Sequence, residues 1–76
     1  MKFYGIGDEE TARGLRLAGV EAGVVRDARG TAEALRLAAG RKDCGVIIIT
    51  AAAAALVRAQ VDEIKLERAG PLIVEI

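Results

Sequence analysis

The chain has 76 residues, of which 53% are hydrophobic, and equal numbers of basic and acidic side chains, 11 of each. This length predicts one domain over residues 1–76, with a core of Ala, Val, Leu and Ile because only 3% of the residues are aromatic. The balanced charge offers no basic stripe to a nucleic acid, and no apolar run reaches the ~20 residues that a membrane-spanning helix requires.

Short apolar runs alternate with helix-forming segments along the chain, and glycines separate many of them. The run at 44–49 is rich in β-branched residues and apolar on both sides, which is typical of a central strand in a parallel sheet. In chain order we expect a strand at 3–6, a helix at 8–18, a strand at 22–26, a turn at 27–30, a helix at 31–39, the strand at 44–49, a helix at 51–68 and a final strand at 72–76.

Capping residues mark the ends of the expected helices. Asp8 precedes the first helix as its N-cap, and Thr31 and Thr50 are expected to cap the second and third helices. Gly19 and Gly40 stand where the first two helices should stop, since glycine readily adopts the left-handed conformation of a helix end. In the third helix, apolar residues at spacings of three and four form one stripe: Ala54, Val57, Val61 and Ile64.

This order of elements predicts an α/β fold with a four-stranded parallel sheet, in the flavodoxin-like order 2-1-3-4, and helices on both faces. We expect Val46, Ile47, Ile48 and Ile49 to be largely buried, because a middle strand is covered from both sides. Partners of such sheets meet the edge formed by the carboxyl ends of the strands. The residues expected to bind a partner at this edge are Asp8 and Glu9 after the first strand, Arg26 and Asp27 after the second, and Thr50 after the third.

The turn after the first strand contains part of a dinucleotide-binding motif. Gly5 and Gly7 match its first two glycines, but Glu10 stands in place of the third. The carboxylates of Asp8, Glu9 and Glu10 would repel a phosphate at this helix N-terminus. We therefore expect ordinary turn glycines, no bound nucleotide and no cofactor.

The same acidic residues resemble the pocket in which a response-regulator receiver binds magnesium. Asp8 and Glu9 would be the ligands, but the aspartate that such a pocket needs after the third strand is replaced by Thr50. N-capping and attraction to the helix dipole explain the carboxylates without a metal, and we prefer this explanation. A receiver-like signalling domain that binds a divalent cation at Asp8 and Glu9 is the alternative function.

An enzyme is the least favoured class. The chain has no serine and no histidine, which excludes a serine-based triad and removes the commonest general base. Cys44 is the only cysteine, so no internal disulfide can form, which is typical of a reducing compartment. We expect Cys44 to be buried and unreactive, and we expect neither a catalytic residue nor a metal site.

Four segments resemble the F subunit of the V/A-type ATPases and ATP synthases, in the same order along the chain. The first is Ile-Gly-Asp-Glu-Glu-Thr at 6–11 with the helix and glycine that follow, and the second is Asp-Cys-Gly-Val-Ile-Ile-Ile-Thr at 43–50. The third, 57–63, resembles the third helix of the family, and the fourth, 70–76, resembles its last strand.

The resemblance implies a non-catalytic rotor component of the central stalk, on the cytoplasmic side of the membrane and peripheral to it. Such a component couples and regulates ATP hydrolysis or synthesis with proton or sodium transport. Its implied partners are the coiled-coil D subunit of the rotor and other ATPase subunits, with no nucleic acid, no insertion into the membrane and no small-molecule substrate.

Two features depart from the family pattern. Ala51 and Ala52 follow Thr50, where the family has polar or acidic residues. The sequence ends at Ile76, whereas the family continues with a loop and a carboxy-terminal helix that embraces the D subunit. We therefore expect this 76-residue chain to bind the D subunit only weakly.

Overall fold

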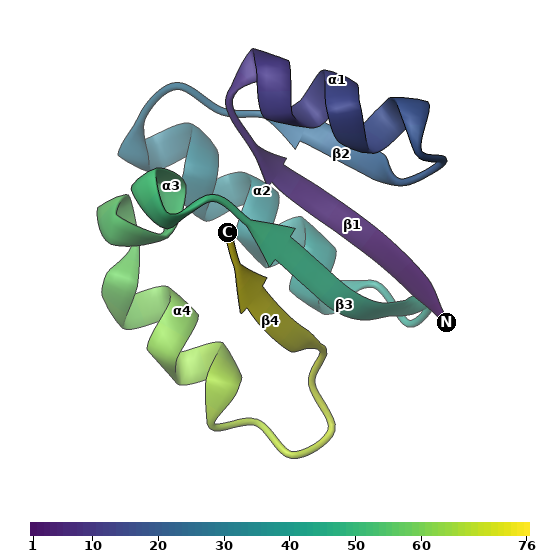
Figure 1. Cartoon of the computed structure of the whole chain (residues 1–76). Coiled ribbons are helices and arrows are strands. Elements are labelled where there is room, and N and C mark those ends of the chain that lie inside the picture. The colour runs from purple at the N-terminus through teal and green to yellow at the C-terminus, as the bar shows by residue number, and fades with distance from the viewer.

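Figure 1 shows the computed structural model, which describes residues 1–76. Its strands form a single four-stranded sheet, and helices lie on both sides of it. The elements are β1 (Lys2–Gly7), α1 (Glu9–Leu17), β2 (Glu21–Val24), α2 (Ala28–Gly40), β3 (Cys44–Ile49), α3 (Ala51–Leu56), α4 (Arg58–Lys65) and β4 (Leu72–Glu75).

All neighbouring strands are parallel, and their order in the sheet is β2-β1-β3-β4. Tyr4 of β1 is aligned with Glu21 of β2 and Ile47 of β3, and Ile47 is aligned with Ile73 of β4. The α/β fold, the parallel pairing and the order 2-1-3-4 predicted from the sequence are confirmed. β1 and β3 are therefore the central strands, and β2 and β4 are the edges.

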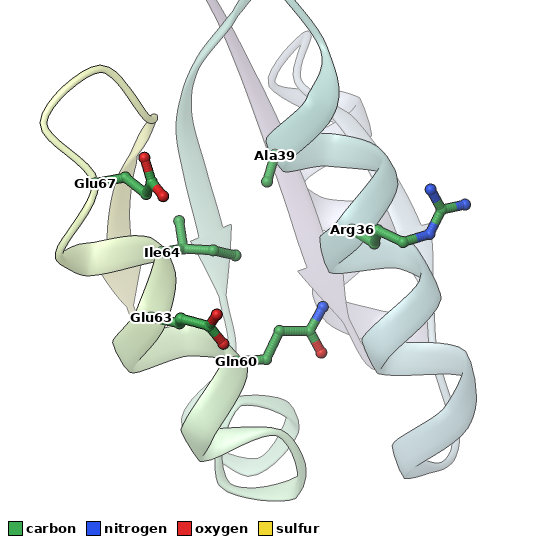
Figure 2. Close-up of a pocket in the computed structure, with 6 residues that line it drawn as sticks. All are labelled: Arg36, Ala39, Gln60, Glu63, Ile64 and Glu67. Carbon is green, nitrogen blue, oxygen red and sulfur yellow. The ribbon is translucent and has the colours of Figure 1, made fainter.

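One face of the sheet holds the hydrophobic core. Ile6, Ile47 and Ile49 are fully buried on this face. α2 contributes Leu35 and α4 contributes Val61, which are also fully buried. Figure 2 shows α2 and α4 side by side in front of the sheet, so these two helices, together with α3, cover the core face.

The opposite face is covered by α1. This helix packs against β1 and β2 (Figure 1), and its Ala12 is fully buried. The packing is close, since a Cβ atom added at Gly5 would lie 2.5 Å from Cδ1 of Leu15. Glycine is needed at position 5 because a larger side chain would push α1 away from the sheet.

The central strand is largely buried, as expected. Val46, Ile47 and Ile49 are buried, and Ile48 is less completely buried than these three. Ile48 lies on the α1 face, in register with Gly5 of β1 and Val74 of β4. Ile48 is less completely buried than its neighbours because α1 packs against β1 and β2 rather than over β3.

The helix expected at 51–68 is two helices, α3 and α4. The break is at Val57, whose φ of −134° and ψ of 38° lie outside the helical region. A straight helix over 51–68 would be ~27 Å long, whereas the six residues of β3 span only ~20 Å. The break keeps both halves on the sheet, where Ala54 of α3 and Val61 of α4 are fully buried.

The second helix begins earlier than expected, at Ala28. Asp27 is its N-cap and accepts a hydrogen bond from the backbone N–H of Gly30 at 2.7 Å, so the turn expected at 27–30 is the first turn of α2. Thr31 is not the cap but a buried residue, and its hydroxyl donates to the backbone oxygen of Asp27 at 2.7 Å. The prediction of Thr31 as the cap was wrong, because Asp27, four positions earlier, caps the helix.

Candidate partner-binding site

The carboxyl ends of the parallel strands meet at one edge of the sheet, and the residues predicted to bind a partner follow these ends. We call Asp8, Glu9, Arg26, Asp27 and Thr50 the rim residues. Their backbone positions are as expected, because Asp8 follows β1, Arg26 lies two positions after β2, and Thr50 follows β3. Their side chains differ in what they contact.

Asp8 is the N-cap of α1, as predicted. Its carboxylate accepts hydrogen bonds from the hydroxyl of Thr11 and, at 3.4 Å, from the backbone N–H of the same residue. The hydrogen bond from the Thr11 hydroxyl lowers the pKa of Asp8 below its ordinary value. Asp8 is therefore an ionised, oriented carboxylate at the positive end of the α1 dipole.

Glu9 and Arg26 connect the ends of β1 and β2 by an ion pair. A guanidinium nitrogen of Arg26 lies 3.6 Å from a carboxylate oxygen of Glu9. The two side chains are 76% and 82% exposed, so water screens the attraction and the pair contributes little to stability. Both charges are therefore free to bind a partner.

Asp27 and Thr50 are engaged in capping. The Asp27 carboxylate is held by the first turn of α2, and the Thr50 hydroxyl accepts from the backbone N–H of Ala53 at 3.1 Å. The backbone N–H of Thr50 donates to the backbone oxygen of Ile6 at 3.1 Å, which extends the pairing of β1 and β3. These two residues fix the shape of the rim.

A hollow of about 380 Å³ lies among the rim residues. Asp8, Arg26 and Thr50 line it together. Glu9 lies next to it, because it is paired with Arg26. Asp27 is not part of the lining. Sequence reasoning missed the apolar residues that line the hollow, although the apolar run after Thr50 was a usable signal. These residues are Val25, Ala52, Ala53 and Leu56.

The glycine at the first turn has a packing role. A Cβ atom added at Gly7 would lie 2.7 Å from Cγ2 of Thr50 and 3.5 Å from Cβ of Thr11. Glycine is therefore needed here to admit Thr50, and the partial dinucleotide motif has a structural explanation. No three His, Cys, Asp or Glu side chains gather in a way that could hold a metal ion.

Sequence reasoning also missed a cluster of charges at the carboxyl end of β4. The Glu75 carboxylate accepts two hydrogen bonds from Arg58 at 2.8 Å each and one from Lys65 at 2.9 Å. The hydrogen bonds from Arg58 and then Lys65 lower the pKa of Glu75 to about 2. This cluster ties α4 to the end of β4.

A second hollow, of about 230 Å³, lies between α2 and α4 (Figure 2). Gln60 crosses it and donates to the backbone oxygen of Ala32 at 3.0 Å, and Arg36 is engaged by Glu33 on its own helix. The hollow therefore lies at the contact between two helices, which a side-chain hydrogen bond connects.

Comparisons with known proteins agree with this fold. The family model of the ATP synthase (F/14-kDa) subunit matches residues 4–76. The crystal structure of the F subunit of the V-type ATP synthase from Archaeoglobus fulgidus superimposes with a TM-score of 0.76 and 24% sequence identity, over 99% of this chain and 95% of that one. No curated protein sequence matches.

The match of the family model extends over nearly the whole chain, and the strand order and the four resembling segments agree with it. None of the helices is long and apolar enough to cross a membrane. The chain belongs to the family of the ATP synthase (F/14-kDa) subunit.

Proposed function

We propose that this chain is a non-catalytic rotor component in the central stalk of a V/A-type ATPase, on the cytoplasmic side of the membrane. In this role it transmits torque and couples ATP hydrolysis or synthesis to proton or sodium transport. Family membership supports the proposal. The helix caps at the rim support it as well, because they make a stiff surface from side chains that are already engaged.

We further propose that the rim residues contact the coiled-coil D subunit. The observation that carries this step is the hollow of about 380 Å³, which has apolar side chains within a charged border. Leu56 is 51% exposed there, and Glu9 and Arg26 stand beside it with their charges in water. An apolar centre with a polar border is the usual composition of a protein–protein contact.

Calorimetry of the chain with the purified D subunit tests this contact. Covering the exposed half of Leu56 should contribute ~1 kcal/mol or more, so Leu56→Ala should weaken binding about fivefold to tenfold. Leu37→Ala is the matched control, because Leu37 is 55% exposed but lies on α2 away from the hollow. Equal affinities of the two variants would show that the contact lies elsewhere.

Reconstitution tests the role of the chain. Adding it to the ATPase complex depleted of its own F subunit should change the rate of ATP hydrolysis, and the chain should remain bound through purification. A chain that neither binds nor changes the rate would contradict the proposed function.

A further inference from the structure

The two edges of the sheet differ in how their backbone groups are engaged. β2 forms one edge, and the guanidinium of Arg16 donates to the backbone oxygen of Ala22 at 2.6 and 3.0 Å. Arg16 therefore closes part of this edge. β4 forms the other edge (Figure 1), and its hydrogen bonds with side chains involve only the carboxylate of Glu75. The backbone of β4 is thus not closed by a side chain.

The hydrogen bonds at the end of β4 define which of its backbone groups point outward. The backbone N–H of Ile76 donates to the backbone oxygen of Ile49 of β3 at 2.9 Å. Since alternate residues of a strand bond to the same neighbour, the even-numbered residues of β4 point their backbone groups towards β3. The N–H and C=O groups of Ile73 and Glu75 therefore point away from the sheet, and they have no partner within the chain.

The side chains of β4 and of the residue after it form an apolar row beside this open edge. Leu72, Val74 and Ile76 are 71%, 46% and 58% exposed. Because side chains alternate along a strand, all three lie on one face of the sheet. The charge of Glu75 lies on the other face, where hydrogen bonds from α4 hold it. An edge strand with unpaired backbone groups and exposed apolar side chains is a template for pairing with another strand.

The sequence of β4 favours one register of antiparallel pairing with a second copy of itself. A twofold axis at Ile73 would place Pro71, which has no N–H, opposite Glu75 of the second copy. An axis at Glu75 would place two carboxylates opposite each other, which is unfavourable. An axis at Val74 places Ile73 opposite Glu75 of the second copy, so that each outward N–H meets an outward C=O.

We propose that two copies of this chain associate through β4, antiparallel and with the twofold axis at Val74, to form one continuous sheet. On the apolar face, Val74 then meets Val74 of the second copy, and Leu72 meets Ile76 of the second copy. This self-complementarity of hydrogen-bonding groups and apolar side chains favours a second copy over an unrelated strand. The four residues of β4 make a contact below ~1,200 Å², so the association is reversible. It lies at the side of the sheet, apart from the hollow at the rim, and goes beyond the proposed function.

Cysteine crosslinking tests this register. The Cα atoms of a non-hydrogen-bonded antiparallel pair lie ~4.5 Å apart, within the range that a disulfide spans. Val74→Cys should therefore form a disulfide between two copies when oxidised glutathione accepts the electrons of the paired thiols. Cys44 should not contribute, because it is buried and burial raises the pKa of its thiol.

Leu72→Cys is the matched control for this crosslinking. Position 72 is more exposed than position 74, but in the proposed register it lies ~13 Å along the strands from its equivalent in the second copy. Leu72→Cys should therefore crosslink at least about tenfold more slowly than Val74→Cys. Equal or faster crosslinking of Leu72→Cys, which random collision would give, overturns the proposal.

Sedimentation equilibrium of the reduced wild-type chain tests the association itself. Between ~10 µM and ~1 mM the mean mass should rise from 7.9 kDa towards twice this value. Val74→Lys places two like charges at the axis and should weaken the association at least about tenfold. Leu37→Lys on α2 is the control, since Leu37 is 55% exposed and far from β4 in the sequence, and it should change the association less than about twofold. A wild type that stays monomeric up to ~1 mM, or equal association of the two variants, overturns the proposal.

Discussion

Neighbouring isoleucines on opposite faces of β3 provide a direct test of the fold. Ile47 is fully buried in the core, whereas Ile48 lies on the opposite sheet face, next to the strands that α1 covers, and is less completely buried. Ile47→Ala and Ile48→Ala remove the same atoms from adjacent positions of one strand. A difference in stability between the two variants therefore measures the cover on the two faces.

The magnitudes follow from burial. Truncating a fully buried isoleucine removes ~2.4 kcal/mol of transfer free energy at ~0.8 kcal/mol per carbon, and the cavity raises the cost to ~2–5 kcal/mol. At Ile48 roughly two thirds or more of that transfer energy is present and no closed cavity is left, so we expect ~1.5–2 kcal/mol. The total stability of 76 residues is ~4–11 kcal/mol, so Ile47→Ala alone brings the chain close to unfolding.

Thermal and urea unfolding, followed by circular dichroism, check the prediction. Each kcal/mol shifts the Tm of a domain of this size by ~4–8 °C, so a difference of ~1–3 kcal/mol should place the Tm of Ile47→Ala ~4–24 °C below that of Ile48→Ala. Equal melting temperatures, or a lower one for Ile48→Ala, would refute the assignment of Ile47 to the core face and of Ile48 to the less completely covered face.

Three further outcomes are expected. The pKa of Glu75 is about 2 in the folded chain, whereas its ordinary value is 4.5. The ionised carboxylate therefore stabilises the fold above about pH 4.5, and this contribution is lost as the pH falls towards 2. The urea midpoints of the wild type and of Glu75→Gln should differ at neutral pH and converge near pH 2. Asp27→Ala removes the N-cap of α2 and should lower the free energy of unfolding by ~0.5–2 kcal/mol, as measured in urea. If Thr31 were the cap, Thr31→Ala would lower it more than Asp27→Ala. Calorimetry with ATP, ADP and NAD should detect no binding, because Gly7 is packed against Thr50 and acidic residues follow it. A dissociation constant below ~100 µM, which corresponds to a binding free energy of about −5.5 kcal/mol, would contradict this expectation.

The sequence by itself determined the order of the elements and the order of the strands. Asp8 and Thr50 cap helices where expected, and Gly19 ends α1 with a φ of 89°. These signals are local, because a cap or a glycine acts on the backbone within one turn. Alternating strands and helices then leave few arrangements of a parallel sheet, so the order 2-1-3-4 could be predicted as well.

The candidate site was predicted only in outline. The ends of β1, β2 and β3 were enough to name the rim residues, because parallel strands finish at one edge. The apolar lining of the hollow and the cluster at Glu75 were missed, since Glu75 meets Arg58 across 17 positions of sequence. Such pairings depend on how α4 lies against β4, which no local pattern encodes.

Only the tertiary structure decided where the helix after β3 breaks and how much of the sheet is covered. The apolar stripe through Val57 continues without interruption in the sequence, yet the chain bends there because a straight helix would extend past the sheet. The less complete burial of Ile48 depends on which strands α1 lies over. Burial is a property of what packs against a residue, so it follows from the number and placement of the helices rather than from the apolar pattern of a strand.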